Sequence, residues 1–168
     1  REVEVDLPYT YKTEKAESIS VSAHNLAKRG KFEQAIGVYL KAIEIEENNP
    51  KLYFDIAENY SHIQAFPKAI AALNKAIALD SSYPHFFNNR GLYHYRLYND
   101  EAAIADYKTA INLDSTNGVY FINLAITYNT LDRTIDACNA FQKAKSLGLD
   151  LNSYKEQIDI IKLIKSCR

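Results

Sequence analysis

The residues best suited to chemistry stand on one short stretch that carries two carboxylates and a histidine. Asp55, Glu58 and His62 follow one another at three- and four-residue steps, which places them on one face of a helix. His24, from an earlier helix, is expected to lie across from them. Such a cluster could bind a divalent metal or carry out acid–base catalysis. We favour the simpler interpretation, a solvated polar helix face, and therefore predict no metal site.

The sequence contains none of the short motifs that position a cofactor or a nucleophile. It has no glycine-rich phosphate loop, no nucleophile elbow and no His-Glu-x-x-His pair. Its 20 basic and 21 acidic residues give a net charge of −1, which offers no attraction to nucleic acid or to anionic membranes. No run of about 18 apolar residues is present. We therefore predict no enzyme activity, no cofactor, no nucleic-acid binding and no membrane insertion.

Residues 84–114 hold two amphipathic helical patterns back to back. In both, small and apolar residues recur at three- and four-residue steps, which is the period of a helix and not of a strand. The tripeptide Tyr98-Asn99-Asp100 separates the two patterns. Asn tolerates a left-handed backbone, and Asp can cap the helix that follows. The stretch therefore predicts a helical hairpin.

The hairpin pattern recurs with a period of about 34 residues, which is the interval between Ala35 and Ala69. One short hairpin cannot bury its own apolar face, so copies of it must stack. Five columns of small or large apolar residues stay in phase through four copies. These columns are Ala23/Ala57/Gly91/Ala125, Ala35/Ala69/Ala103/Ala137, Tyr39/Leu73/Tyr107/Phe141, Ala42/Ala76/Ala110/Ala144 and Ile45/Leu79/Leu113/Leu147.

This pattern resembles the tetratricopeptide repeat, which has a small residue and an aromatic in its first helix and A-x3-F/Y-x2-A in its second. The resemblance implies an all-α fold, a right-handed α–α superhelix (a solenoid) of four helical hairpins plus a C-terminal capping helix. The units it covers are residues 16–49, 50–83, 84–117 and 118–151.

Some positions depart from the family pattern. Of the glycines favoured between the two helices only Gly30 is kept, and Gln64, Tyr98 and Asp132 replace the others. In the first unit Ile19 stands where later units have an aromatic residue. We expect these departures to alter the turns and the packing of the first unit without changing the fold.

The two ends of the chain differ from the repeats. Residues 1–13 are expected to form an extended leader, because apolar and acidic residues alternate there and Pro8 bars a helix. We favour an extended leader that is tethered by Tyr9 or Tyr11; the alternative is that it lies along a groove, its own or a neighbour's, as a ligand would. Residues 14–168 are then a single domain, in which residues 152–166 form the capping helix. Because the chain starts at Arg1 and contains no Met, we expect that a signal peptide, a tag or a further domain has been left out, and the compartment stays open.

Asn89 and Asn123 are one repeat period apart and so occupy equivalent places on neighbouring first helices. In members of the family that bind extended peptides, an Asn at this place often grips the peptide backbone, and a carboxamide can both donate and accept. The alternative is a polar residue that is merely tolerated on an exposed helix face. The other residues that we assign to this peptide-binding groove are Asn88, Leu92, Tyr95, Arg96, Ile122, Ile126, Phe54 and Asp55.

Members of the family that bind chaperone tails hold the terminal carboxylate with a clamp of lysines, asparagines and an arginine. The matching places here hold Ser20, His24, Asp55, His85 and Asn89, so the cations are missing. Asp55 and Glu58 would also repel an acidic tail. We therefore expect weak or no binding of such peptides.

Cys138 and Cys167 fall in separate predicted helices, and no metal-ligand spacing links them. Cys138 falls where the other units have isoleucine, so we expect a small buried apolar residue.

Together these features predict a non-catalytic scaffold that binds a partner peptide or helix in its concave groove. The alternatives are a regulatory module of a larger enzyme or sensor protein, and a self-association module that forms a weak homo-oligomer.

Overall fold

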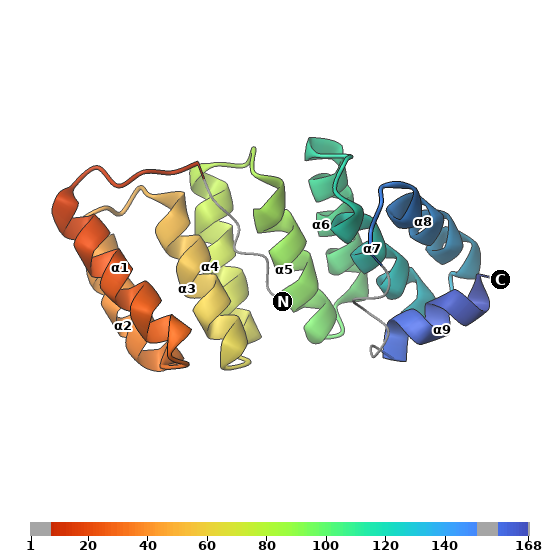
Figure 1. The fold of residues 1–168 in the computed structure, drawn as a ribbon, viewed down its shortest axis with the longest axis horizontal. Helices are drawn as coiled ribbons and strands as arrows, with labels where there is room; N and C mark the ends of the chain where they lie inside the picture. The colour runs from red at the N-terminus through yellow and green to blue at the C-terminus, as the bar shows by residue number, and fades with distance from the viewer. Residues whose placement is uncertain (1–7, 151–157, 168) are drawn as a thin grey trace. The chain divides into compact units, whose positions relative to one another are not determined.

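The computed structural model describes residues 8–150 and 158–167, and within these ranges every regular element is a helix. Successive helices pair as hairpins joined by short turns (Figure 1). They belong to two compact units, residues 1–81 with α1–α4 and residues 82–168 with α5–α9. The single domain over residues 14–168 therefore stays a prediction. The helices are α1 (Glu14–Lys28), α2 (Phe32–Ile43), α3 (Pro50–His62), α4 (Phe66–Leu79), α5 (Pro84–Arg96), α6 (Asp100–Leu113), α7 (Gly118–Thr130), α8 (Thr134–Ser146) and α9 (Ile158–Ser166).

The first helix of each hairpin in the first unit begins where the sequence supplies a capping side chain. At the start of α1, Thr13 Oγ1 accepts a hydrogen bond from the Ala16 N–H at 3.2 Å. At the start of α3, the Asn49 side chain accepts one from the Lys51 N–H at 3.1 Å, and Pro50 follows it as the first helical residue. Proline fits there because its missing N–H would have no partner inside the helix.

The turns inside the four hairpins share one backbone feature at the position where the family favours glycine. Gly30 has φ +73°, and its equivalents Gln64, Tyr98 and Asp132 have φ values of 57°, 59° and 55°. All four residues therefore adopt the left-handed conformation, which costs a residue with a Cβ more than it costs glycine. The four turns therefore differ in the side chain at this position, but they share the same backbone conformation.

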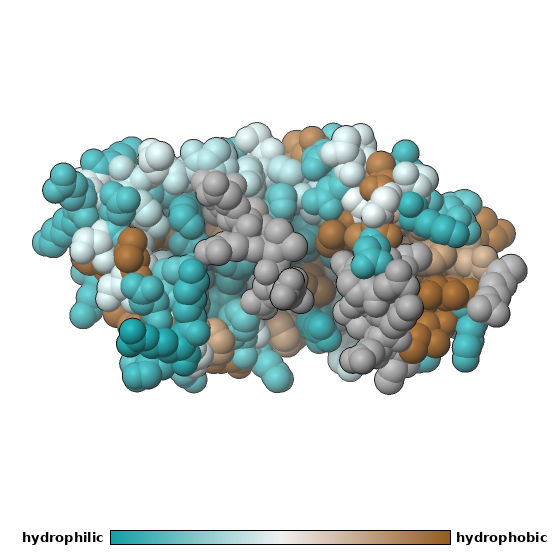
Figure 2. Space-filling model, in the orientation of Figure 1, coloured by the Kyte–Doolittle hydropathy of each residue, from teal (hydrophilic) through white to brown (hydrophobic). Residues whose placement is uncertain are grey.

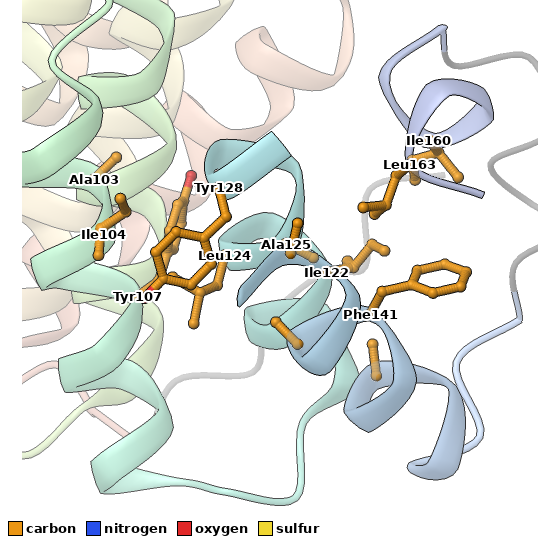
Figure 3. Packing of buried hydrophobic residues seen from close by; sticks show 13 residues of the cluster. Ala103, Ile104, Tyr107, Ile122, Leu124, Ala125, Tyr128, Phe141, Ile160 and Leu163 are labelled. Atoms are coloured by element: carbon orange, nitrogen blue, oxygen red, sulfur yellow. The ribbon is translucent and has the colours of Figure 1, made fainter. Parts of the chain in front are cut away.

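The core of the second unit lies between α6, α7, α8 and α9 (Figure 3). The alanine columns are fully buried there, as Ala103, Ala125 and Ala137 have no exposed surface. Ile160 and Leu163 of α9 are also fully buried, and in Figure 3 they face Ala125 and Ile122 of α7. The apolar side of α9 therefore covers the last hairpin. Residues 152–157 of the expected capping helix lie outside the described residues.

The first unit repeats the same packing. Its alanine columns are fully buried, and the large residues Tyr39 and Leu73 fill the space between the paired helices. The face of α1 and α3 seen in Figure 2 is mostly hydrophilic, so the apolar residues of this unit lie chiefly inside it. Among the described residues, no helix combines the length and the apolar character needed to cross a bilayer.

The two cysteines form a disulfide between α8 and α9. The expectation that Cys138 is only a small apolar core residue is therefore wrong. The two Cα atoms lie 5.2 Å apart, because α9 packs beside α8 in the place of a further first helix. The spacing of the two cysteines in the sequence carries no such signal by itself.

We predict opposite effects for the same substitution at two glycines. Gly30→Ala should lower the free energy of unfolding by about 1 kcal/mol, because its left-handed backbone disfavours a Cβ although no atom lies within 4 Å of one. Gly37 lies in the interior of α2, where a Cβ would also have no atom within 4 Å. Gly37→Ala should therefore raise the free energy of unfolding by about 0.5–1 kcal/mol, because alanine favours the helical conformation more than glycine does. Urea denaturation followed by circular dichroism measures both, and two changes of the same sign would contradict the turn geometry.

Loss of the disulfide should destabilise the protein. Cys138→Ser should lower the free energy of unfolding by about 3 kcal/mol, because the bond closes a long loop in the unfolded chain. Chemical denaturation of the oxidised protein tests this, with reduced wild-type protein as the control that should match the variant. Equal stability of the oxidised and reduced wild type would show that the bond contributes nothing.

Candidate functional site

Three asparagines of the second unit form a chain of side-chain hydrogen bonds between α5 and α7. Asn123 Nδ2 donates to Asn88 Oδ1 at 2.9 Å, and Asn88 Nδ2 donates to Asn89 Oδ1 at 3.3 Å. Asn88 is buried, whereas Asn89 and Asn123 are half-buried. These bonds use the oxygen of Asn89 and the nitrogen of Asn123. The other ends of these two carboxamides, a donor and an acceptor, are not used in this chain of bonds.

Next to the asparagines lies a second polar pair that joins the first turns of the same two helices. The Tyr120 hydroxyl and His85 Nδ1 are 3.1 Å apart, and the two rings meet edge to face with centroids 5.7 Å apart. Burial raises the pKa of Tyr120 to about 12, and burial lowers the pKa of His85, although Asp114 acts against this. A neutral imidazole can accept the phenol hydrogen bond. This part of the surface therefore presents neutral dipoles at neutral pH.

The apolar residues assigned to the groove divide into two groups. Leu92, Tyr95 and Ile126 are half-buried, and Arg96 is exposed. Ile122 has no exposed surface and belongs to the core cluster, so the expectation that it contacts a ligand is wrong. Figure 3 shows its side chain pointing toward α9.

A single helical position explains this correction. Phe54 and Ile122, with Asn88, occupy equivalent places in three repeats, and they are only 2%, 0% and 7% exposed. Phe54, like Ile122, is therefore a core residue and not a lining residue. The next position along the helix, which holds Asn89 and Asn123, is rotated by about 100° and keeps part of its surface. The first column therefore belongs to the core on α5 and α7, and only the second is accessible there.

In the first unit the carboxylate of Asp55 forms an ion pair inside α3. Lys51 Nζ lies 3.2 Å from each carboxylate oxygen, and Asp55 is only 9% exposed. Burial raises the pKa of Asp55 to about 6, although the ammonium of Lys51 acts against this. The interpretation of a solvated polar face is therefore wrong for Asp55. A nearly buried carboxylate is costly to ionise, and the lysine offsets part of that cost.

The residues that could have formed a metal site have other surroundings. The exposed ring of His62 stacks on Phe32 with centroids 4.3 Å apart. Over the ranges that the structure describes, no three His, Cys, Asp or Glu side chains gather closely enough to hold a metal ion.

Sequence reasoning missed two groups of contacts. One is the ion pair between Arg90 and Asp106, which joins α5 to α6 with N–O distances of 2.7 and 2.8 Å. The other is the pair of contacts by which Thr10 and Thr13 of the leader bind Asn49 and Glu46, beyond the tether expected at Tyr9 or Tyr11. The ion pair does not recur at the repeat period, and the leader lies outside the repeats, so the residues of the leader carry no periodic signal.

The ion pair gives a prediction about pH. The carboxyl of Asp55 should titrate near pH 6, and Lys51→Met should raise this pKa further because the ammonium that lowers it is removed. Since the pKa in the folded state lies above the ordinary value of 3.8, protonation of Asp55 favours folding; this stabilisation is full below pH 3.8 and is lost as the pH rises to about 6. Carbon-detected NMR of the side-chain carboxyl measures the pKa. Lys75→Met on the exposed face of α4 is the control that should leave it unchanged.

The chain matches family models and solved structures of repeat proteins. A family model for the TPR repeat matches residues 23–61 and 63–97, and a second model, the tetratricopeptide repeat, matches residues 84–117. The first TPR domain of Spaghetti (RPAP3), bound to the HSP90 peptide SRMEEVD, is 27% identical, with 72% of this chain and 96% of that chain covered and a TM-score of 0.69. The second TPR domain of human RPAP3, in complex with the HSP70 peptide SGPTIEEVD, is 29% identical over 67% of this chain and 94% of that chain, with a TM-score of 0.64.

A more distant match shows the fold alone. MamA from Desulfovibrio magneticus RS-1 is 13% identical, with 93% of this chain and 95% of that chain covered and a TM-score of 0.77. No curated protein sequence matches the chain. The two family models together span more than half of the 168 residues and carry the repeat columns, so the chain belongs to the tetratricopeptide repeat family.

Proposed function

We propose that this chain is a non-catalytic scaffold that holds an extended segment of a partner protein against α5 and α7. The observation that supports this most directly is the chain of three carboxamides. Two solved relatives of the same family are TPR domains bound to peptides, which supports the same class of function.

The carboxamides suit a peptide backbone. A peptide unit presents one N–H and one C=O, and the unused ends of Asn123 and Asn89 offer an acceptor and a donor. The hydrogen bonds to Asn88 hold both side chains in place before a ligand arrives, so little side-chain entropy is lost on binding. Recognition of this kind is independent of the side chains of the partner.

Selectivity then comes from the neighbouring side chains. Half-buried Leu92, Tyr95 and Ile126 offer apolar contact, and exposed Arg96 offers one charge-assisted contact. The RPAP3 domains bind peptides that end in Glu-Glu-Val-Asp. In this chain the places of the carboxylate clamp hold Ser20, Asp55 and His85, and the pKa of His85 is lowered. We therefore propose a partner segment that is not an acidic tail.

The carboxamides can be tested with peptides selected from a random displayed library on the full chain. Asn89→Ala combined with Asn123→Ala should weaken a selected peptide at least tenfold, because two hydrogen bonds to its backbone are lost. Fluorescence anisotropy measures the affinity. Asn139→Ala, at an exposed position on α8, is the matched control and should have no effect.

An unchanged affinity in the double variant would contradict the proposal. Loss of the Asn123 donor leaves Asn88 Oδ1 without this bond, which should cost about 1 kcal/mol of stability. Thermal unfolding of the variant shows whether it is folded at the temperature of the binding assay.

A further inference from the structure

The described part of the leader is held on the first unit through hydrogen bonds to two segments, the connection between α2 and α3 and the residue that follows α4. The Tyr9 hydroxyl donates to Asp80 Oδ2 at 2.6 Å, and Asn49 Nδ2 donates to the carbonyl of Thr10 at 3.4 Å. The Thr13 N–H and hydroxyl donate to Glu46 Oε1 at 2.7 and 3.2 Å. In Figure 1 the red segment before α1 runs past the upper end of α3 to that of α4. The hydrogen bond of Tyr9 is the tether that we expected, and Thr10 and Thr13 add further contacts to the first unit.

Tyr11 stands in the leader between the residues that make these hydrogen bonds. It is half-buried, and burial raises the pKa of its phenol, with the Asp55 and Glu17 carboxylates nearby raising it further. The hydroxyl of Ser20 is close enough to lower this pKa but is not aligned as a hydrogen bond. Ser20 is only 2% exposed, and its hydroxyl has no hydrogen-bond partner among the described residues. We call the Tyr11 site the groups that hydrogen-bond to the leader, Glu46, Asn49 and Asp80, together with Ser20, Tyr39, Lys51 and Asp55 near the phenol.

The leader is bound in the manner of a peptide ligand. Tyr9 and Tyr11 are half-buried, whereas Pro8, Thr10 and Lys12 between and beside them are exposed, which is the alternation of an extended chain on a surface. One of its carbonyls is bound by a carboxamide, and its side chains contact groups held on helices. Extended peptides are recognised by this combination of backbone hydrogen bonds and pockets for alternate side chains.

The acceptor groups are built into the first unit. Glu46 is only 6% exposed; burial raises the pKa of its carboxyl, but the hydrogen bonds from Asn49 and Thr13 outweigh this and lower the pKa overall. A buried carboxylate needs such donors to stay ionised. Asp80 stands one repeat period after Glu46, in the equivalent place, and accepts the Tyr9 hydroxyl. The repeat itself thus provides two anionic acceptors along the path of the leader.

We propose that the Tyr11 site is a second peptide-binding site, for an extended partner segment that carries the Tyr-x-Tyr pattern of residues 9–11. The leader fills this site within its own chain, and a partner segment of the same chemistry binds by displacing it. The site lies in the first unit alone and does not depend on the carboxamide chain of the second unit.

The probe is a fluorescent peptide with the sequence of residues 8–13, Pro-Tyr-Thr-Tyr-Lys-Thr. It is added to the full chain and to a full-length variant that combines Tyr9→Ala with Tyr11→Ala and so empties the site. Anisotropy should show at least tenfold tighter binding to the variant, because the peptide no longer competes with the leader. A peptide with alanine in place of its second tyrosine should bind at least tenfold more weakly to that variant. Equal affinity of the wild type and the variant would overturn the proposal.

A second pair of variants locates the peptide. In the emptied background, Ser20→Leu should weaken binding at least tenfold by filling the site. We expect the variant to fold, because the equivalent places of other repeats hold the large residues Phe54 and Ile122. Ser22→Leu, on an exposed position of the same helix, should leave binding unchanged. Equal effects of the two substitutions would overturn the assignment. Asn89→Ala combined with Asn123→Ala should also leave the binding of the peptide unchanged. This result separates the present proposal from the function proposed for the second unit.

Two further measurements start from the wild-type protein. In the bound leader the Thr13 N–H donates a hydrogen bond to Glu46, which should slow its exchange with solvent. Adding the peptide at millimolar concentration to the wild-type protein should therefore increase hydrogen exchange at the Thr13 amide. No change in that exchange would contradict displacement. Dimerisation of the wild type that the emptied variant loses would show that a second copy supplies the segment, and would overturn the assignment to a partner protein.

Discussion

Close approach of paired helices at small residues is the constraint on which the rest of the structure depends. Every alanine of the Ala35 and Ala42 columns is fully buried. Among the glycines the closest approach is at Gly91, where a Cβ would lie 2.8 Å from the Tyr107 ring and 3.1 Å from the Ala103 carbonyl. A larger side chain there would have to move a ring that is itself buried. Because the small residues recur in every repeat, the same approach is made in each hairpin.

This packing decides which residues remain for recognition. The buried columns use most of each helix, so the accessible face of a first helix is narrow. On α3, α5 and α7 it includes the place of Asp55, Asn89 and Asn123. Side chains at this place are half-buried or nearly buried. Asp55 is paired with Lys51 and Asn123 with Asn88, so these hydrogen bonds are made within the protein. Polar groups that are already paired and fixed in position suit the binding of a partner, because they lose little freedom when it arrives.

The sequence was sufficient for the fold because its signal is periodic. The alanine columns fix the register of all four hairpins, and they imply that Pro84 begins a helix, as it does in α5. The site was harder to predict, because one step along a helix changes a lining position into a core position. Asn88 and Asn89 are neighbours, yet the first is buried and the second is not. Periodicity predicts a stripe that is wide enough to include both.

Contacts without a period were beyond the reach of this reasoning. The disulfide joins a repeat to a helix outside the repeats, so Cys167 has no column that would indicate its partner. The pairing of Lys51 with Asp55 follows from their i, i+4 spacing, but the depth at which the carboxylate is buried does not. That depth depends on neighbouring elements, including Tyr11 of the leader, which is extended and has no helical pattern.

The two units present different chemistry on equivalent helices, and this difference bears on what each can bind. On α3 the accessible face carries a charged pair, and any ligand must compensate for the desolvation of both charges. On α5 and α7 the corresponding groups are neutral carboxamides and a histidine whose pKa is lowered, so the cost of desolvation is smaller. A phenol, with an apolar ring and one hydroxyl, can cover a charged pair while it keeps a polar contact. A bare backbone suits the carboxamides better, so each unit favours a different feature of a bound chain.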